Sequence, residues 1–185
     1  MAQLKLFMLL LGCKPEGRHT EQHDVFFGIG EQLRDLIPDM KAFWPEAKDK
    51  LHIDGYREVN IVDGYQVKVV EKKESTGQDV QLFFLNLGGY KPDEMEEFHY
   101  KILSVQKDIG VAIRESKQTT FFKHTTFGNA TSHVDDKYGV DVDDVHAVKD
   151  ILPAYLKERY TLEITPVTDA GADVLHLGYF QLSKI

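Results

Sequence analysis

Two nearly continuous hydrophobic runs stand out in the pattern of apolar and polar residues. LFMLLLG begins at Leu6, and LFFLNLG begins 76 positions later, at Leu82. Uninterrupted apolar runs of this length are typical of β-strands that are covered on both faces. We therefore predict a core strand at each position, and the recurrence of the run indicates an internal repeat.

The repeat extends to polar residues. The shift of 76 positions superposes a Glu-x-His pair on its counterpart, and a shift of 81 positions superposes a His-x-Asp pair on another. The superposed pairs are Glu21 with His23 on Glu97 with His99, and His52 with Asp54 on His133 with Asp135. We expect a first repeat at residues 1–78 and a second at residues 79–185, packed together as one pseudo-symmetric globular unit.

Three segments have the periodicity of amphipathic helices. Apolar residues recur at helical spacing behind Thr20, a candidate N-cap, and predict a helix that ends or kinks at Pro38. A regular apolar stripe behind a capping box predicts a second helix over residues 93–116. A third helix is predicted over residues 141–160, with a bend at Pro153.

Alternating apolar and polar residues predict hairpins. Residues 59–69 alternate on either side of Asp63-Gly64, a two-residue turn, and the chain then continues into the strand at 80–87 to complete a meander. A second hairpin is predicted between residues 160–165 and 174–182. Each half is thus strand, helix and further strands, so the predicted fold class is α+β with mixed or antiparallel sheets.

Composition and charge restrict the partners. The chain has 185 residues, 42% hydrophobic and 28% charged, which is typical of a globular domain. Lys and Arg number 22 against 30 Asp and Glu, and the net charge of −8 opposes binding to nucleic acid or to an anionic membrane. A basic protein partner agrees with this charge, and an unpaired sheet edge would allow a homodimer.

The single cysteine, Cys13, bears on localisation. One cysteine excludes an intrachain disulfide, and a reducing compartment is its simplest environment. The apolar run before Cys13 is too short for the hydrophobic region of a signal peptide. We therefore predict a cytoplasmic protein and interpret Cys13 as a buried hydrophobic residue.

The repeated His and carboxylate pairs are the first candidate site. Imidazoles and carboxylates ligate zinc, manganese and non-haem iron, and we consider His23, His52 and Asp54 as metal ligands. A metal-assisted hydrolase would use these three residues together with Glu21 and a metal-bound water. Two other interpretations stay open, namely a structural hydrogen-bond network and an acid/base pair that works without a metal.

The loop after the first core strand is the second candidate site. Lys14 and Arg18 lie in this loop, before the first predicted helix, and the N-terminus of a helix favours anions. The second half has acidic residues at the same place. We therefore predict that the first loop binds a phosphate or a carboxylate. The candidate ligand-binding residues are Lys14, Arg18, Glu21, His23 and Asp24.

The stretch LLLGCKPEGRHTEQHDVFFGIG, from Leu9 to Gly30, carries a family resemblance. Together with the later HIDGY segment and the two copies in one chain, it resembles the signature of a bacterial family called domain of unknown function number fifteen-forty-three. The resemblance implies a cytosolic bacterial protein and no particular substrate or cofactor. It also implies that a functional site includes some of Arg18, Glu21, His23 and Asp24.

Two functions compete on this evidence. The first is a non-enzymatic intracellular binding protein whose partner is a basic protein or a small anion, because the chain is acidic and has no Gly-x-Ser-x-Gly, His-Glu-x-x-His or Cys-x-x-Cys motif. The alternative is the metal-assisted hydrolase. The two differ in whether the chain binds a stoichiometric metal.

Overall fold

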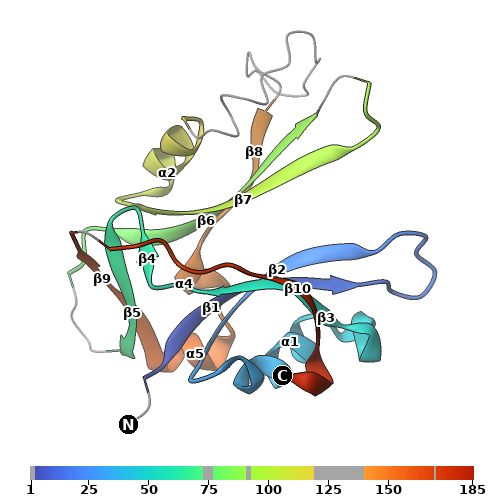
Figure 1. Cartoon of the computed structure of the whole chain (residues 1–185). Helices are drawn as coiled ribbons and strands as arrows, with labels where there is room; N and C mark the ends of the chain where they lie inside the picture. The colour runs from blue at the N-terminus through green and yellow to red at the C-terminus, as the bar shows by residue number, and fades with distance from the viewer. Residues whose placement is uncertain (1–2, 73–76, 91–92, 119–139, 169) are drawn as a thin grey trace. The chain divides into compact units, whose positions relative to one another are not determined.

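The computed structural model describes residues 3–72, 77–90, 93–118, 140–168 and 170–185. The chain forms two compact units, of which unit 1 comprises residues 1–76 and 151–185 and unit 2 comprises residues 77–150 (Figure 1). The fold is a mixture of helices and strands, and the described strand pairs are antiparallel. Residues 151–185, expected in the second repeat, thus belong to unit 1. Within the described residues, every helix is too short or too polar to cross a membrane.

The larger sheet of unit 1 is built around the first hydrophobic run. Its strand order is β10-β3-β1-β2. The strands are β1 (Lys5–Cys13), β2 (Gln22–Gly30), β3 (His52–Glu58) and β10 (His176–Gln181). The odd-numbered side chains of β1 from Phe7 to Cys13 are buried in a core with Leu36 and Met40. The predicted core strand is therefore confirmed.

The first predicted helix is wrong over most of its length. Residues 22–30 form β2, and helical structure begins only with the 3-10 helix η1 (Leu33–Leu36), followed by α1 (Ile37–Phe43) and the 3-10 helix η2 (Pro45–Lys50). Pro38 lies in the first turn of α1, where its missing N–H is tolerated, and not at the end of a helix. The apolar residues of β2 pack as a strand because β1 pairs with them along the whole length of β2.

The second sheet of unit 1 contains the predicted hairpin. Strands β4 (Ile61–Val62) and β5 (Tyr65–Glu71) are joined by Asp63 and Gly64, which have φ of 51° and 76°. Two positive φ values are typical of a type I′ turn, as the sequence predicted. Strand β5 pairs next with β9 (Tyr160–Pro166), whereas β10 pairs with β3. The predicted meander and the hairpin between residues 160–165 and 174–182 are therefore wrong.

Unit 2 is a three-stranded sheet with the order β7-β6-β8. The elements are β6 (Gln81–Tyr90), β7 (Glu97–Gln106), α2 (Ile109–Ser116), β8 (Val140–Ala147) and α4 (Val148–Ile151). Strand β6 is the second hydrophobic run, and its Leu85 and Leu87 are fully buried. The predicted helix at 93–116 is correct only for α2, which begins after Asp108, whose side chain accepts a hydrogen bond from the backbone of Val111.

The third predicted helix, over residues 141–160, is also partly a strand. Its first part is β8, and its remainder is divided between α4 and α5 (Ala154–Arg159), which are separated at Pro153 as expected. Residues 140–147 are extended because they pair with β6. The chain ends in unit 1 with a last 3-10 helix, η3 (Leu182–Lys184).

The central strands β1 and β6 have the same pattern of connections. Each pairs with the next strand as a hairpin and, after helical structure, with a third strand on its other edge. The register of β1 with β3 shifts between Leu10 and Leu11, and that of β6 with β8 shifts between Asn86 and Leu87. The two β-bulges are thus separated by the 76 positions that separate the hydrophobic runs.

A hydrogen bond between α1 and α5 makes the stability of unit 1 depend on pH. The Tyr155 hydroxyl donates to the Asp39 carboxylate at 2.6 Å, and burial together with this bond raises the pKa of Tyr155 to about 12, from an ordinary 10.0. Because the folded state holds the proton more tightly, this contribution is complete below pH 10 and is lost as the pH rises to about 12.

We expect Tyr155→Phe to remove this dependence. Urea denaturation of the wild type at about pH 9 and about pH 11.5 should show a loss of unfolding free energy that is smaller in Tyr155→Phe. Tyr179→Phe, which removes another exposed tyrosine of unit 1, should retain the wild-type loss. Equal losses in the wild type and in Tyr155→Phe would contradict the assignment.

Candidate metal-binding site

Three strands of unit 1 place two histidines opposite one glycine. His23 of β2 and His52 of β3 both pair with Gly12 of β1, so the three residues form a row across the sheet and their side-chain positions share one face. A Cβ atom at Gly12 would collide with the Asp54 carboxylate and the His52 ring. Glycine is therefore required at this position for the polar groups to approach each other over β1.

Asp54 reaches both histidines because it lies in a β-bulge. Leu10 pairs with Gly55 and Leu11 pairs with Ile53, so Asp54 is the extra residue of β3. A bulge redirects a side chain relative to a regular strand. The Oδ2 atom of Asp54 lies 3.1 Å from Nε2 of His23, and its Oδ1 atom lies 3.4 Å from Nε2 of His52.

His52 is buried, with 4% of its surface exposed, and its two ring nitrogens have different roles. Nδ1 lies 3.0 Å from the carbonyl oxygen of Lys50. Because a carbonyl can only accept, Nδ1 carries the hydrogen, and a neutral ring then presents a lone pair at Nε2. Tyr179 of β10 packs against this ring with 4.4 Å between the ring centroids.

The Nε2 edge of the His52 ring faces negative charge. Its Nε2 atom lies 2.9 Å from Oε1 of Glu21 as well as 3.4 Å from Asp54, yet neither contact is aligned as a hydrogen bond. Nε2 of His52 and Oδ2 of Asp54 are both buried without a hydrogen-bond partner. Buried polar atoms in this condition are costly, and a cation between them would satisfy both.

The four predicted residues therefore form a chain of contacts, Glu21–His52–Asp54–His23. The side chains of Glu21 and His23 are 46% and 42% exposed, so solvent reaches this end of the cluster. On a helix, Glu21 and His23 would have pointed in different directions. The chain is extended here instead, and residues two apart in an extended chain share a face. Glu21 and His23 can therefore both reach the cluster.

The anion site predicted in the first loop loses part of its physical basis. Lys14 and Arg18 are exposed in the connection between β1 and β2, and a strand follows this connection where a helix N-terminus was expected. The argument from the helix dipole is therefore wrong. Asp24 follows His23 in β2, so its side chain points to the opposite face, and its carboxylate accepts from the backbone N–H of Val25. Anion binding by Lys14 and Arg18 stays a prediction.

Sequence reasoning missed two contributors to the cluster. The Lys50 carbonyl, which orients His52, has no signature in the sequence. Gly12 had one, because a glycine within an apolar strand marks a close approach. Cys13 is buried at the end of β1, and burial raises the pKa of its thiol, so it behaves as the predicted buried hydrophobic residue.

Comparison with known proteins finds a family match for the segment that contains the cluster. Residues 18–69, which contain all four residues, match the family described as Domain of Unknown Function (DUF1543), so the expected resemblance is confirmed for this range. The crystal structure of a protein Il1583 from Idiomarina loihiensis is similar, with a TM-score of 0.63, 20% identity and 97% of each chain covered. This likeness shows a shared fold. No protein with a curated description is similar in sequence at a significant level.

Proposed function

We propose that unit 1 is a binding module for a divalent first-row transition metal, with zinc as its best match, and that His23, His52 and Asp54 are the ligands. The observation that carries the proposal is the buried Nε2 of His52, which faces two carboxylates without a hydrogen bond. A metal-bound histidine commonly donates its other N–H to a backbone carbonyl, as Nδ1 of His52 does to Lys50.

Two distances in the cluster match those around a shared cation, although the three ligand atoms are less closely grouped than those of Glu97, His99 and Asp143 in unit 2. Ligand atoms around one tetrahedral zinc lie about 3.3 Å apart, and Asp54 lies 3.1 Å from His23 and 3.4 Å from His52. Two imidazoles and a carboxylate are a ligand set of zinc and of non-haem iron. The structural hydrogen-bond network is a weaker explanation, because Nε2 of His52 makes no aligned hydrogen bond to either carboxylate.

A hydrolytic use of the site is the second candidate. A zinc ion with three protein ligands acts as a Lewis acid and lowers the pKa of a bound water to about 7. Glu21, at the solvent end of the cluster, is placed to accept a proton. A cavity of about 350 Å³ shares Tyr179 with the His52 ring, and its charged lining residues are Lys41, Lys48 and Asp49.

We further propose that the two units contain copies of one ancestral strand unit. Support comes from the matching antiparallel pairings of β1 and β6 with their neighbours and from bulges that lie the same 76 positions apart as the hydrophobic runs. In this proposal the second repeat ends near β8, and the C-terminal strands β9 and β10 complete the sheets of unit 1.

Zinc titration of untagged, chelator-treated protein tests the proposed function. Competition with a chromophoric chelator should show one tight zinc per chain, and His52→Ala should weaken this site at least about 100-fold. His176→Ala is the matched control, because His176 lies in the same sheet and stacks on Tyr56, away from the cluster. Equal zinc affinity in the wild type and in His52→Ala would overturn the proposal.

A further inference from the structure

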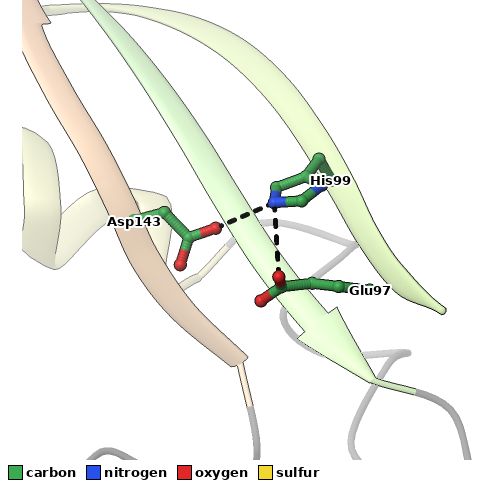
Figure 2. A group of neighbouring side chains, drawn as sticks. All are labelled: Glu97, His99 and Asp143. Carbon is green, nitrogen blue, oxygen red and sulfur yellow. Dashed lines mark ion pairs between the residues drawn. The ribbon is translucent and has the colours of Figure 1, made fainter. Parts of the chain in front are cut away.

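A second cluster of one histidine and two carboxylates lies in unit 2. His99 and Glu97 are two residues apart on β7, so they share a face of the sheet, and Asp143 reaches the same place from β8 across β6 (Figure 2). Nε2 of His99 lies 3.3 Å from Oδ2 of Asp143 and 3.8 Å from Oε2 of Glu97. One ligand atom from each residue lies within 4.8 Å of the other two.

This cluster has the same backbone features as the cluster in unit 1, namely a glycine on the central strand and a β-bulge on the strand that carries the aspartate. His99 pairs with Gly88 of β6, and a Cβ atom at Gly88 would collide with the Asp143 carboxylate. Asn86 pairs with Asp144 and Leu87 with Val142, so Asp143 is the extra residue of a β-bulge. The glycine and the bulge therefore leave room for three polar side chains to meet over the central strand.

Strand pairing also identifies the counterpart of the His-x-Asp pair. His52 pairs with Gly12, and residue 141 pairs with Gly88. The position of Asp54 thus corresponds to Asp143 and not to Asp135, which lies with His133 outside the described residues. The charged residue at the bulge is thus retained in unit 2, within an acidic run of the sequence.

We propose that Glu97, His99 and Asp143 form a second, independent site for a divalent cation and that this site accepts Mn²⁺. One imidazole with two carboxylates is a harder ligand set than the two imidazoles of unit 1. Carboxylate and water ligands suit Mn²⁺, although Zn²⁺ and Cu²⁺ bind a given set of ligands more tightly. The three side chains are each about one-third exposed, so solvent completes the coordination and the ion exchanges readily. The proposal stands on the contacts of unit 2 alone and does not depend on metal binding in unit 1.

Electron paramagnetic resonance of Mn²⁺ provides the test, because free Mn²⁺ gives a sharp six-line signal that binding removes. The full chain carrying His52→Ala isolates the site of unit 2 from the site of unit 1. We expect this variant to bind about one Mn²⁺ per chain. Adding either His99→Ala or Asp143→Asn should weaken binding at least about tenfold.

A control variant and the contrary outcomes complete the experiment. His146→Ala removes an exposed histidine from β8, outside the cluster, and should bind Mn²⁺ as the parent does. Circular dichroism checks that each variant is folded. Mn²⁺ binding that survives both His99→Ala and Asp143→Asn, or a parent that binds no Mn²⁺, would overturn the second site. Neither result bears on the zinc site, since zinc affinity is measured separately with His52 intact.

Discussion

Replacement of Asp54 by asparagine is expected to abolish the stabilisation of the protein by zinc without lowering the stability of the metal-free protein. The carboxylate of Asp54 contacts both histidines, at 3.1 Å and 3.4 Å. Asparagine has the same shape, lacks the negative charge and can donate an N–H to the lone pair of His52. Without metal, the substitution removes the unfavourable contact between the Asp54 carboxylate and Nε2 of His52. With metal, it removes an anionic ligand of the ion.

The expected size of this effect is measurable. Zinc at about 100 times its dissociation constant should stabilise the wild type by about 2.7 kcal/mol, which corresponds to a rise of roughly 5–10 °C in melting temperature for a chain of this size. We expect no comparable rise in Asp54→Asn. Calorimetry of both proteins with zinc and with EDTA gives the comparison. If the cluster is instead a structural hydrogen-bond network, Asp54→Asn lowers metal-free stability by about 1–3 kcal/mol.

Asp173 provides the matched control for this experiment. Its carboxylate accepts hydrogen bonds from the backbone N–H groups of Asn60 and Ile61 at 3.1–3.2 Å, so its role in unit 1 is structural. Asp173→Asn should lower the unfolding free energy with or without zinc and leave the zinc-induced rise intact. The two aspartates should thus respond in opposite ways. A loss of the zinc effect in Asp173→Asn would show that the assay reports folding and not the site.

Replacement of Leu11 by alanine is expected to cause the largest loss of stability. Leu11 is fully buried in β1, within the core that Leu36 and Met40 complete from the helical segments. Deleting a fully buried leucine side chain removes its hydrophobic contribution and leaves a cavity, at a cost of about 2–5 kcal/mol. Urea denaturation at neutral pH measures this cost.

Leu177→Ala makes the same chemical change at the surface. Leu177 lies in the edge strand β10 and is 75% exposed, so we expect a change within about 0.5 kcal/mol. Leu11→Ala should still bind zinc while it is folded, because the side chain of Leu11 and the metal cluster lie on opposite faces of β1. Equal destabilisation by the two substitutions would contradict the placement of β1 at the centre of the core.

The hydrophobic pattern predicted the two central strands correctly and misassigned their neighbours. The runs at Leu6 and Leu82 are continuous, and each forms the central strand of its sheet. Strands β2 and β7 were interpreted as helices because their apolar residues, continued into the following helical segments, also satisfy helical spacing. The pairing of β3 with β10 joins residues more than a hundred positions apart, and no local pattern encodes it.

The residues of the candidate site could be predicted from the sequence, but the contacts among their side chains could not. The repeat selected Glu21, His23, His52 and Asp54, and the structure brings these four into contact. The bulge that directs Asp54 depends on the register between two strands, which single-strand periodicity cannot show. The contact of Asp143 with His99 in unit 2 could not be predicted for the same physical reason.

Anomalous diffraction at the zinc absorption edge, from crystals of untagged protein grown with zinc, tests the central claim most directly. The metal site that we propose predicts a strong peak within bonding distance of Nε2 of His23, Nε2 of His52 and the carboxylate of Asp54. In that structure, the Nδ1 atom of His52 still donates to the Lys50 carbonyl. Density that shows the imidazoles hydrogen-bonded directly to Asp54 and Glu21, with no anomalous peak between them, would contradict the claim.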